Sequence, residues 1–255
     1  MTDSIQTDVV ERILQIRIVR PERKNALTHT MYDALAAALL QADEQSEIRA
    51  IFITGTDDCF TSGNDVQDFL SHPPSGPDSP VFRFMRTLQQ CRKPVVAAVN
   101  GPAVGIGATL LLHCDLVYLG PDAKLQMPFV KLGLCPEYAS SLLVPAMVGH
   151  RRATELLLLG DTLRAEEAVS AGIANAVFDE YYQEKAFDKA REIAALPPAA
   201  IRMAKRLMKE PVEEQISRQI AREGAAFVER LASPEAREAM MAFMQKRPAD
   251  FSAFE

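Results

Sequence analysis

The sequence predicts an α/β domain that is followed by a helical C-terminal region. Short apolar segments rich in β-branched residues alternate with helical patterns up to about residue 180, whereas the rest of the chain is almost entirely helical in pattern. The chain has 255 residues, of which 48% are apolar, so it can bury a large core without disulfides or metals. We expect a core at residues 1–196 and a helical region at residues 197–255.

The strands are predicted from alternation and from short apolar runs. In residues 9 to 19 the apolar residues Leu14, Ile16 and Ile18 alternate with Gln15 and Arg17, which is typical of a half-buried strand. Three further runs have the same character, at residues 49–54, 95–99 and 173–178.

The helices are predicted from apolar spacing and from end signals. Thr28 is a candidate N-cap for a helix in which Met31, Leu35 and Leu39 recur on one face. Residues 71 to 80 contain four prolines and no apolar side chain, so they predict a solvated loop. The other predicted helices are residues 82–90, 151–159, 164–171, 181–196, 199–209, 212–231 and 234–245.

Charge and composition exclude several classes of partner. The formal net charge is -6 and no run of Lys and Arg is longer than two, which argues against a nucleic-acid groove. The four cysteines have neither CxxC spacing nor the density of a disulfide scaffold, which favours reduced thiols in the cytoplasm. No apolar run approaches 18 residues and the N-terminal residues resemble no signal peptide, so we expect no membrane span.

A glycine-rich turn follows the apolar run at residues 95–99. The chain breaks at Asn100-Gly101-Pro102 and passes through Gly105-Ile106-Gly107 into a helical pattern. Such a turn can point backbone N–H groups at an anion or at an oxyanion that develops during a reaction. A simple packing turn is the alternative. The turn-rich loop around Ser62-Gly63-Asn64 could likewise present free amides.

Glu137 is the candidate acid or base. It stands between Pro136 and an apolar helical segment, and its neighbours Leu134, Cys135 and Tyr138 are apolar or neutral. Burial in such surroundings would raise the pKa of the carboxyl towards the operating range of a proton shuttle. The alternative is an ordinary acid at a helix N-terminus. We interpret Cys135 as a small buried thiol, since no histidine lies near it in the sequence.

Two further groups of polar residues are assigned no chemistry. The four histidines, at positions 29, 72, 113 and 150, are scattered without ligand spacing, so we predict no metal site. Asp115 follows an apolar helical segment and is interpreted as structural.

The motifs together resemble those of the crotonase (enoyl-CoA hydratase/isomerase) superfamily over essentially the whole chain. The matching segments are residues 62–65, 94–107, 114–118, 132–133 and 160–178. The resemblance implies a crotonase-like spiral of ββα repeats, a C-terminal helical trimerisation region and a homotrimer or hexamer. It also implies an acyl-CoA thioester substrate, of which coenzyme A is part, with no separate cofactor.

The carboxylates distinguish reactions within this superfamily. Hydratases carry glutamates at the positions that Thr109 and Phe129 occupy here, and neither of these residues can move a proton from carbon. The segment around Glu137, PEYASS, resembles the PEGCSS of peroxisomal-type Δ3,Δ2-enoyl-CoA isomerases, from which Tyr138 and Ala139 depart. The resemblance therefore implies an isomerase that converts 3-enoyl-CoA to 2-trans-enoyl-CoA.

The resemblance also implies roles for single residues. The N–H groups of Asn64 and Ile106 would form the oxyanion hole, and Glu137 would carry the proton. The predicted substrate-binding residues are Arg23, Lys24 and Ala26 along the nucleotide, and Ser62, Gly63, Asp65 and Gly105 near the thioester. Two alternatives stay open: another crotonase-type reaction, such as hydration, hydrolysis or decarboxylation of an unusual acyl-CoA, and a non-catalytic acyl-CoA-binding paralogue.

Overall fold

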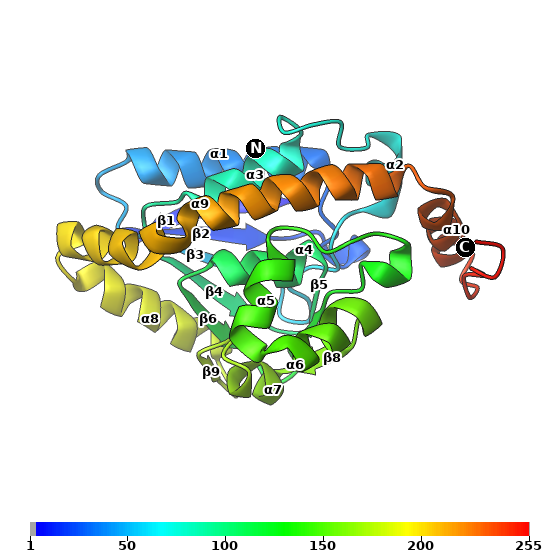
Figure 1. Ribbon diagram of the computed structural model, residues 1–255. Helices are drawn as coiled ribbons and strands as arrows, with labels where there is room; N and C mark the ends of the chain where they lie inside the picture. The colour runs from blue at the N-terminus through cyan, green and yellow to red at the C-terminus, as the bar shows by residue number, and fades with distance from the viewer. Residues whose placement is uncertain (1–3, 255) are drawn as a thin grey trace.

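A computed structural model describes residues 4–254, which form two sheets surrounded by helices (Figure 1). The larger sheet has six strands in the order β1-β2-β3-β4-β6-β9, and the smaller has the order β5-β7-β8. The strands are β1 Ile5–Val10, β2 Ile13–Ile18, β3 Ala50–Thr54, β4 Val95–Val99, β5 Pro102–Val104, β6 Leu116–Leu119, β7 Lys124–Gln126, β8 Thr162–Arg164 and β9 Ala176–Val177.

The helices cover both faces of the larger sheet. Figure 1 shows α1 and α3 along one side of it and α8 along the other. The helices are α1 His29–Glu44, α2 Val66–Ser71, α3 Pro80–Gln89, α4 Ile106–Thr109, α5 Ser140–Val148, α6 His150–Thr154, α7 Ala165–Ser170, α8 Tyr182–Ala195, α9 Pro198–Leu231 and α10 Pro234–Met244. No helix within residues 4–254 has the length and apolarity that a bilayer crossing demands.

The two central strands of the larger sheet were predicted accurately because both are buried throughout. β3 pairs in parallel with β4, and every residue of both strands is buried. A parallel strand covered on both faces has no solvent side, so it is apolar throughout. The predicted strands at residues 49–54 and 95–99 are therefore confirmed to within one residue.

The prediction for residues 9 to 19 is wrong in its boundaries. A hairpin begins before this segment, at Ile5, and in it β1 pairs antiparallel with β2 through a turn at Glu11 and Arg12. These two residues have φ angles of 51° and 67°, which Gly or Asn usually supply, so the sequence gives no turn signal. The alternation of Leu14, Ile16 and Ile18 is confirmed, because all three are buried.

Two helix ends were predicted correctly from local signals. Thr28 caps α1 by accepting a hydrogen bond from the N–H of Met31, and Gly160 ends the helical segment 150–159 in the left-handed conformation. The strand predicted at residues 173–178 is present but shorter, since only β9, Ala176–Val177, is extended. The first residue of the predicted strand, Ile173, donates its N–H to the carbonyl of Ala168 and closes the end of α7.

The predicted break between residues 209 and 212 is also wrong, because α9 runs through Pro211 without interruption. A proline removes at least one hydrogen bond from a helix. Here the part of α9 that follows Pro211 packs against the core, which compensates for that loss. Ile220 and Phe227 of α9 are buried in the main core, and Figure 1 shows α9 lying across the other layers.

Asp115 has the structural role that the sequence predicted. One carboxylate oxygen accepts hydrogen bonds from the N–H of Val95, at 2.7 Å, and from the Lys205 ammonium, at 2.6 Å. This ion pair joins the start of β4 to α9, so α9 is attached to the larger sheet by a largely buried charge pair.

Candidate active site

Two loops that are far apart in the sequence lie side by side at one end of the sheets. The N–H of Thr61 donates to the carbonyl of Pro102 at 3.1 Å, and the N–H of Val104 donates to the carbonyl of Thr61 at 3.0 Å. Gly63 has a φ of 91°, and a Cβ atom there would lie 2.8 Å from the carbonyl oxygen of Val104. A side chain at position 63 would therefore force the loops apart.

The second glycine turn gives α4 its starting direction. Gly105 has φ 57° and ψ -119°, a conformation that side-chain-bearing residues avoid, and its N–H donates to Gln126 at 2.8 Å. Ile106 is the first residue of α4, so its N–H has no carbonyl within the helix. Within residues 4–254, neither this N–H nor that of Asn64 has a hydrogen-bond partner, which leaves both available to a ligand.

The loop that contains Arg23, Lys24 and Ala26 packs directly against the Ser62 loop. The carbonyl of Lys24 accepts a hydrogen bond from the N–H of Ser62 at 3.0 Å. Ala26 is buried, whereas the Arg23 and Lys24 side chains are exposed. Asn25, which the sequence analysis did not single out, is fully buried and donates its side-chain amide to Cys59 at 2.7 Å.

The carboxylate of Asp65 organises the loop from within. It accepts a hydrogen bond from Arg20 at 2.7 Å and two from the N–H groups of Gln67 and Asp68, so it caps α2. Burial raises the pKa of Asp65, but the hydrogen bonds from Arg20 and from the backbone outweigh it and hold the pKa below its usual value. The partners of the Asp65 carboxylate therefore all lie within the protein. Asp65 directly follows Asn64, whose N–H is free within the described part of the chain.

Glu137 is buried, as its apolar neighbours predicted. The residue is only 5% exposed, and its Oε1 atom accepts a hydrogen bond from the Thr109 hydroxyl at 2.6 Å. Thr109 is the last residue of α4, one turn after Ile106, so the carboxyl lies against the helix that presents the free amide. Burial raises the pKa of Glu137 to about 8, and the Thr109 hydrogen bond opposes that rise.

The backbone after Glu137 is held in an uncommon conformation. Tyr138 and Ala139 both have positive φ angles, 60° and 59°, although neither is glycine. Tyr138 is held there by packing: its ring stacks on His113 at 3.7 Å between centroids, and its hydroxyl donates to the carbonyl of Met85 at 2.8 Å. The tyrosine that departs from the family's glycine thus fills the core beneath the site.

Two further residues near the site, besides Asn25, were missed by the sequence analysis. Glu223 of α9 is buried; its Oε1 accepts a hydrogen bond from the N–H of Ser141 at 3.0 Å, while its Oε2 has no partner within residues 4–254. Its charge adds to the rise in the pKa of Glu137. Tyr32 of α1 donates its hydroxyl to the side chain of Asn64. No local pattern could have identified either contact, because both join distant parts of the chain.

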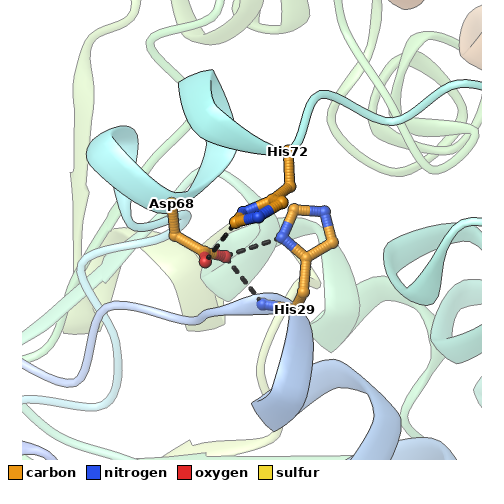
Figure 2. Close-up of side chains that lie close together, drawn as sticks. All are labelled: His29, Asp68 and His72. Carbon is orange, nitrogen blue, oxygen red and sulfur yellow. Dashed lines mark hydrogen bonds and ion pairs between the residues drawn. The ribbon is translucent and has the colours of Figure 1, made fainter.

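The histidines are not all scattered, so that part of the sequence analysis is wrong. The rings of His29 and His72 lie next to each other beside the carboxylate of Asp68, as Figure 2 shows. His113 is buried under Tyr138, and burial lowers its pKa to about 3. Cys135 is half-buried and its pKa is raised to about 11 by burial, which agrees with an unreactive thiol.

The arrangement can combine two chemical tasks. Two unpaired amides can bind the oxygen of a carbonyl compound and stabilise negative charge on it, while a buried carboxyl with a raised pKa can accept and return a proton. The two-sheet fold with C-terminal helices and this site together define an α/β protein of the crotonase type.

Comparison with known proteins gives the same answer. The family model described as enoyl-CoA hydratase/isomerase matches residues 8–253. The structure superposes on that of Pseudomonas aeruginosa OdaA with a TM-score of 0.93 and 52% identity, over 95% of this chain and 99% of the other. The chain therefore belongs to the enoyl-CoA hydratase/isomerase family of the crotonase superfamily.

Curated relatives of similar identity have different names. The chain is 35% identical to enoyl-CoA delta isomerase 2 of Rattus norvegicus over 92% of its own length, but it spans only 62% of that protein. It is also 35% identical to 1,2-epoxyphenylacetyl-CoA isomerase of Escherichia coli, over 99% of both chains. A probable enoyl-CoA hydratase of Mycobacterium tuberculosis, echA6, is 35% identical over 94% of this chain and 96% of its own length.

The buried carboxyl of Glu137 should make the stability of the protein depend on pH. Its pKa is about 8 in the folded state and 4.5 in the unfolded state, so between these values the folded state binds the extra proton. The stabilisation is complete below pH 4.5 and is lost as pH rises through about 8. We expect Glu137→Gln to become more stable relative to wild type as pH rises from roughly 5.5 to 8.5, by up to about 1.4 kcal/mol per pH unit.

Thermal-unfolding midpoints of the two proteins across this pH range test the expectation. Glu229→Gln, which alters an exposed glutamate of α9, is the matched control and should follow the wild type at every pH. A constant difference between Glu137→Gln and the wild type over the whole range would contradict the assigned rise in pKa.

Proposed function

We propose that this protein is an enoyl-CoA isomerase that moves the double bond of a 3-enoyl-CoA to give 2-trans-enoyl-CoA. The observation that carries the proposal is the position of Glu137, a buried carboxyl bonded to the helix that presents the free N–H of Ile106. The family membership and the relatives named as delta isomerases support it.

The proposed mechanism needs one carboxylate and two amides. The thioester oxygen accepts hydrogen bonds from the N–H groups of Asn64 and Ile106, and the Glu137 carboxylate removes a proton from C2. The negative charge spreads from the oxygen through the conjugated carbons, and Glu137 returns the proton to C4. Each amide donor is worth roughly 3 kcal/mol to such a transition state, because it is fixed in place before the charge develops.

The residues at the two hydratase positions favour this reaction. Thr109 donates its hydroxyl to Glu137 and has no acidic proton of its own to transfer. Phe129 is buried close to the Gly105 turn, where a Cβ atom built on Gly105 would be 3.9 Å from the phenyl ring. A phenyl ring at this place excludes water and cannot activate it, which supports proton transfer between carbons.

The substrate carries its own coenzyme A, so no separate cofactor is proposed. The exposed Arg23 and Lys24 side chains lie in the loop that packs against Ser62, and we assign them to the nucleotide, with Lys24 at a phosphate. Ala26, Gly63 and Gly105 would let the pantetheine arm and the thioester approach the backbone. In this proposal Asp65 holds the loop in place and reaches the ligand only indirectly.

Hydration of a 2-enoyl-CoA is the second candidate, and Glu223 is the observation that favours it. Hydration is served by two carboxylates, and Glu223 supplies a second buried one whose charge raises the pKa of Glu137. Relatives named as probable hydratases share the same degree of identity with this chain. Product analysis with 2-enoyl-CoA and 3-enoyl-CoA side by side separates the two reactions.

We also propose that the chain assembles as a homotrimer or hexamer in the cytoplasm. Large apolar side chains are exposed along α9 and α10, among them Leu207 at 59%, Met208 at 78% and Phe243 at 62%. Such a concentration is unusual on the surface of a monomer and supports an interface between copies. The four free cysteines fit a reducing compartment.

Replacing Glu137 by glutamine should abolish isomerisation with little effect on binding. The amide keeps the volume of the side chain but cannot accept the C2 proton, so kcat should fall by about 10²-fold to 10⁴-fold while KM changes little. The measurement is turnover of 3-enoyl-CoA together with exchange of C2 hydrogen for deuterium. If Glu137→Gln retained most of both activities, another group would be the base.

The pH dependence of kcat/KM should respond in opposite directions to two neighbours of Glu137. Activity needs the carboxylate, so it should rise with pH towards about 8. Thr109→Val removes a hydrogen bond that lowers the pKa of Glu137, so the profile should move to higher pH. Glu223→Gln removes a charge that raises that pKa, so the profile should move to lower pH. Glu229→Gln is the control, and shifts in the same direction would contradict this account.

The assembly is tested by light scattering of the full chain after size-exclusion chromatography. We expect three or six times the mass of one chain, and we expect Leu207→Glu combined with Met208→Glu to reduce it. A single-chain mass at micromolar concentration would exclude the proposed assembly.

A further inference from the structure

A second cluster of polar side chains lies outside the acyl-CoA site, between the start of α1 and the end of α2. It contains His29, Asp68 and His72, as Figure 2 shows. The Nδ1 atom of His29 is 2.7 Å from one carboxylate oxygen of Asp68, and the Nδ1 atom of His72 is 3.6 Å from the other. One ligand atom from each residue lies within 4.8 Å of the other two.

We propose that His29, Asp68 and His72 form a binding site for a divalent transition-metal ion, zinc in the first instance. Two imidazoles and one carboxylate are a donor set that suits Zn²⁺ and related ions better than Mg²⁺ or Ca²⁺. Asp68 lies in α2 and His72 is the residue that follows the last turn of this helix, so both come from one end of α2, and His29, the first residue of α1, completes the set.

The distances match the requirement of a small tetrahedral ion. Bonds of about 2.0–2.1 Å place neighbouring ligand atoms roughly 3.3 Å apart. The distances from the two histidines to the Asp68 carboxylate, 2.7 Å to one oxygen and 3.6 Å to the other, lie on either side of that value. To reach it, the exposed His72 ring and the Asp68 carboxylate would have to rotate, because the three ligand atoms lie within 4.8 Å of one another.

Asp68 contacts His29 more closely than His72. One carboxylate oxygen accepts hydrogen bonds from the backbone N–H of His29, at 2.8 Å, and from its ring. The backbone contact orients the carboxylate in advance, as outer hydrogen bonds do at metal sites, whereas the ring contact would be given up when Nδ1 of His29 binds the ion. The Nδ1 atom of His72 lies 3.6 Å from the other oxygen, which is too long for a hydrogen bond. A metal ion bound to both groups would connect His72 to Asp68.

The fourth position of the ion would face solvent. The His72 side chain is 70% exposed, and a surface cleft of about 540 Å³ lies beside both histidines. The cleft is lined by the proline-rich loop between α2 and α3, whose one carboxylate, Asp78, pairs with Arg86 and is not part of the cluster. Three protein ligands with a water molecule in the fourth place are therefore expected.

Metal binding at this place would tie α2 to α1. α2 begins directly after the Asn64-Asp65 pair of the acyl-CoA site, and its Phe69 packs edge-on against Phe227 of α9, with ring centroids 6.1 Å apart. An ion at the other end of α2 would hold this helix in place from outside the reacting centre. We therefore assign the ion a stabilising role and no part in the proton transfer.

The test uses tag-free full-length protein, stripped of metal with a chelator and titrated with zinc chloride in a calorimeter. We expect one zinc ion per chain, and we expect Co²⁺ to give the intense visible absorption of a four-coordinate site. Asp68→Asn keeps an acceptor for the N–H of His29, and His72→Ala alters an exposed side chain, so both should fold. Each should weaken zinc binding by about tenfold or more, since ligands matter at least as much as their outer partners.

Two control variants distinguish this site from zinc binding elsewhere on the protein. His150→Ala removes an exposed histidine on another part of the surface and should bind zinc as the wild type does. Glu137→Gln should also bind zinc normally, so the metal site and the proposed isomerase activity succeed or fail independently. Zinc should raise the thermal-unfolding midpoint of the wild type and of both controls, but not that of His72→Ala.

Absence of saturable zinc binding by the wild type would overturn the proposal. Zinc binding that is unchanged in both Asp68→Asn and His72→Ala would overturn it equally, because the ion would then be held elsewhere.

Discussion

The buried carboxyl of Glu137 is the constraint on which the rest of the site depends. An ionised carboxylate is costly to bury, so its protonated form is favoured until neighbouring groups compensate. The Thr109 hydroxyl offsets part of that cost, whereas Glu223 adds to it. The balance places the pKa at about 8, where the group can both take and give a proton near neutral pH.

The two glycine turns provide the complementary half of the site. Gly63 permits the close approach of two loops, and Gly105 starts α4 in a direction that leaves the N–H of Ile106 without a partner among residues 4–254. Backbone amides in this position are fixed by the fold and need no reorganisation when a charge develops. α2 follows directly from the first loop. Its position is therefore held both by the capping carboxylate of Asp65 and by the contacts of Asp68 with His29 and His72.

Only the tertiary structure decided which distant side chains meet. Glu223 lies in α9, and it reaches the vicinity of Glu137 because that helix continues through Pro211 and packs on the core. His29 and His72 gave no spacing signal, yet the fold places both beside Asp68. Contacts of this kind depend on how whole elements pack, and hydrophobic packing outweighs local propensity, so no short window of sequence contains them.

The sequence by itself determined the features that depend on neighbouring residues. The central strands at residues 50–54 and 95–99, the cap at Thr28 and the burial of Glu137 all follow from local apolar patterns or local hydrogen bonding. The family resemblance correctly indicated the crotonase fold. The hairpin at Glu11 and Arg12, the contacts of Glu223 and the histidine pair were left to the tertiary structure, because pairing and packing across the chain override local signals.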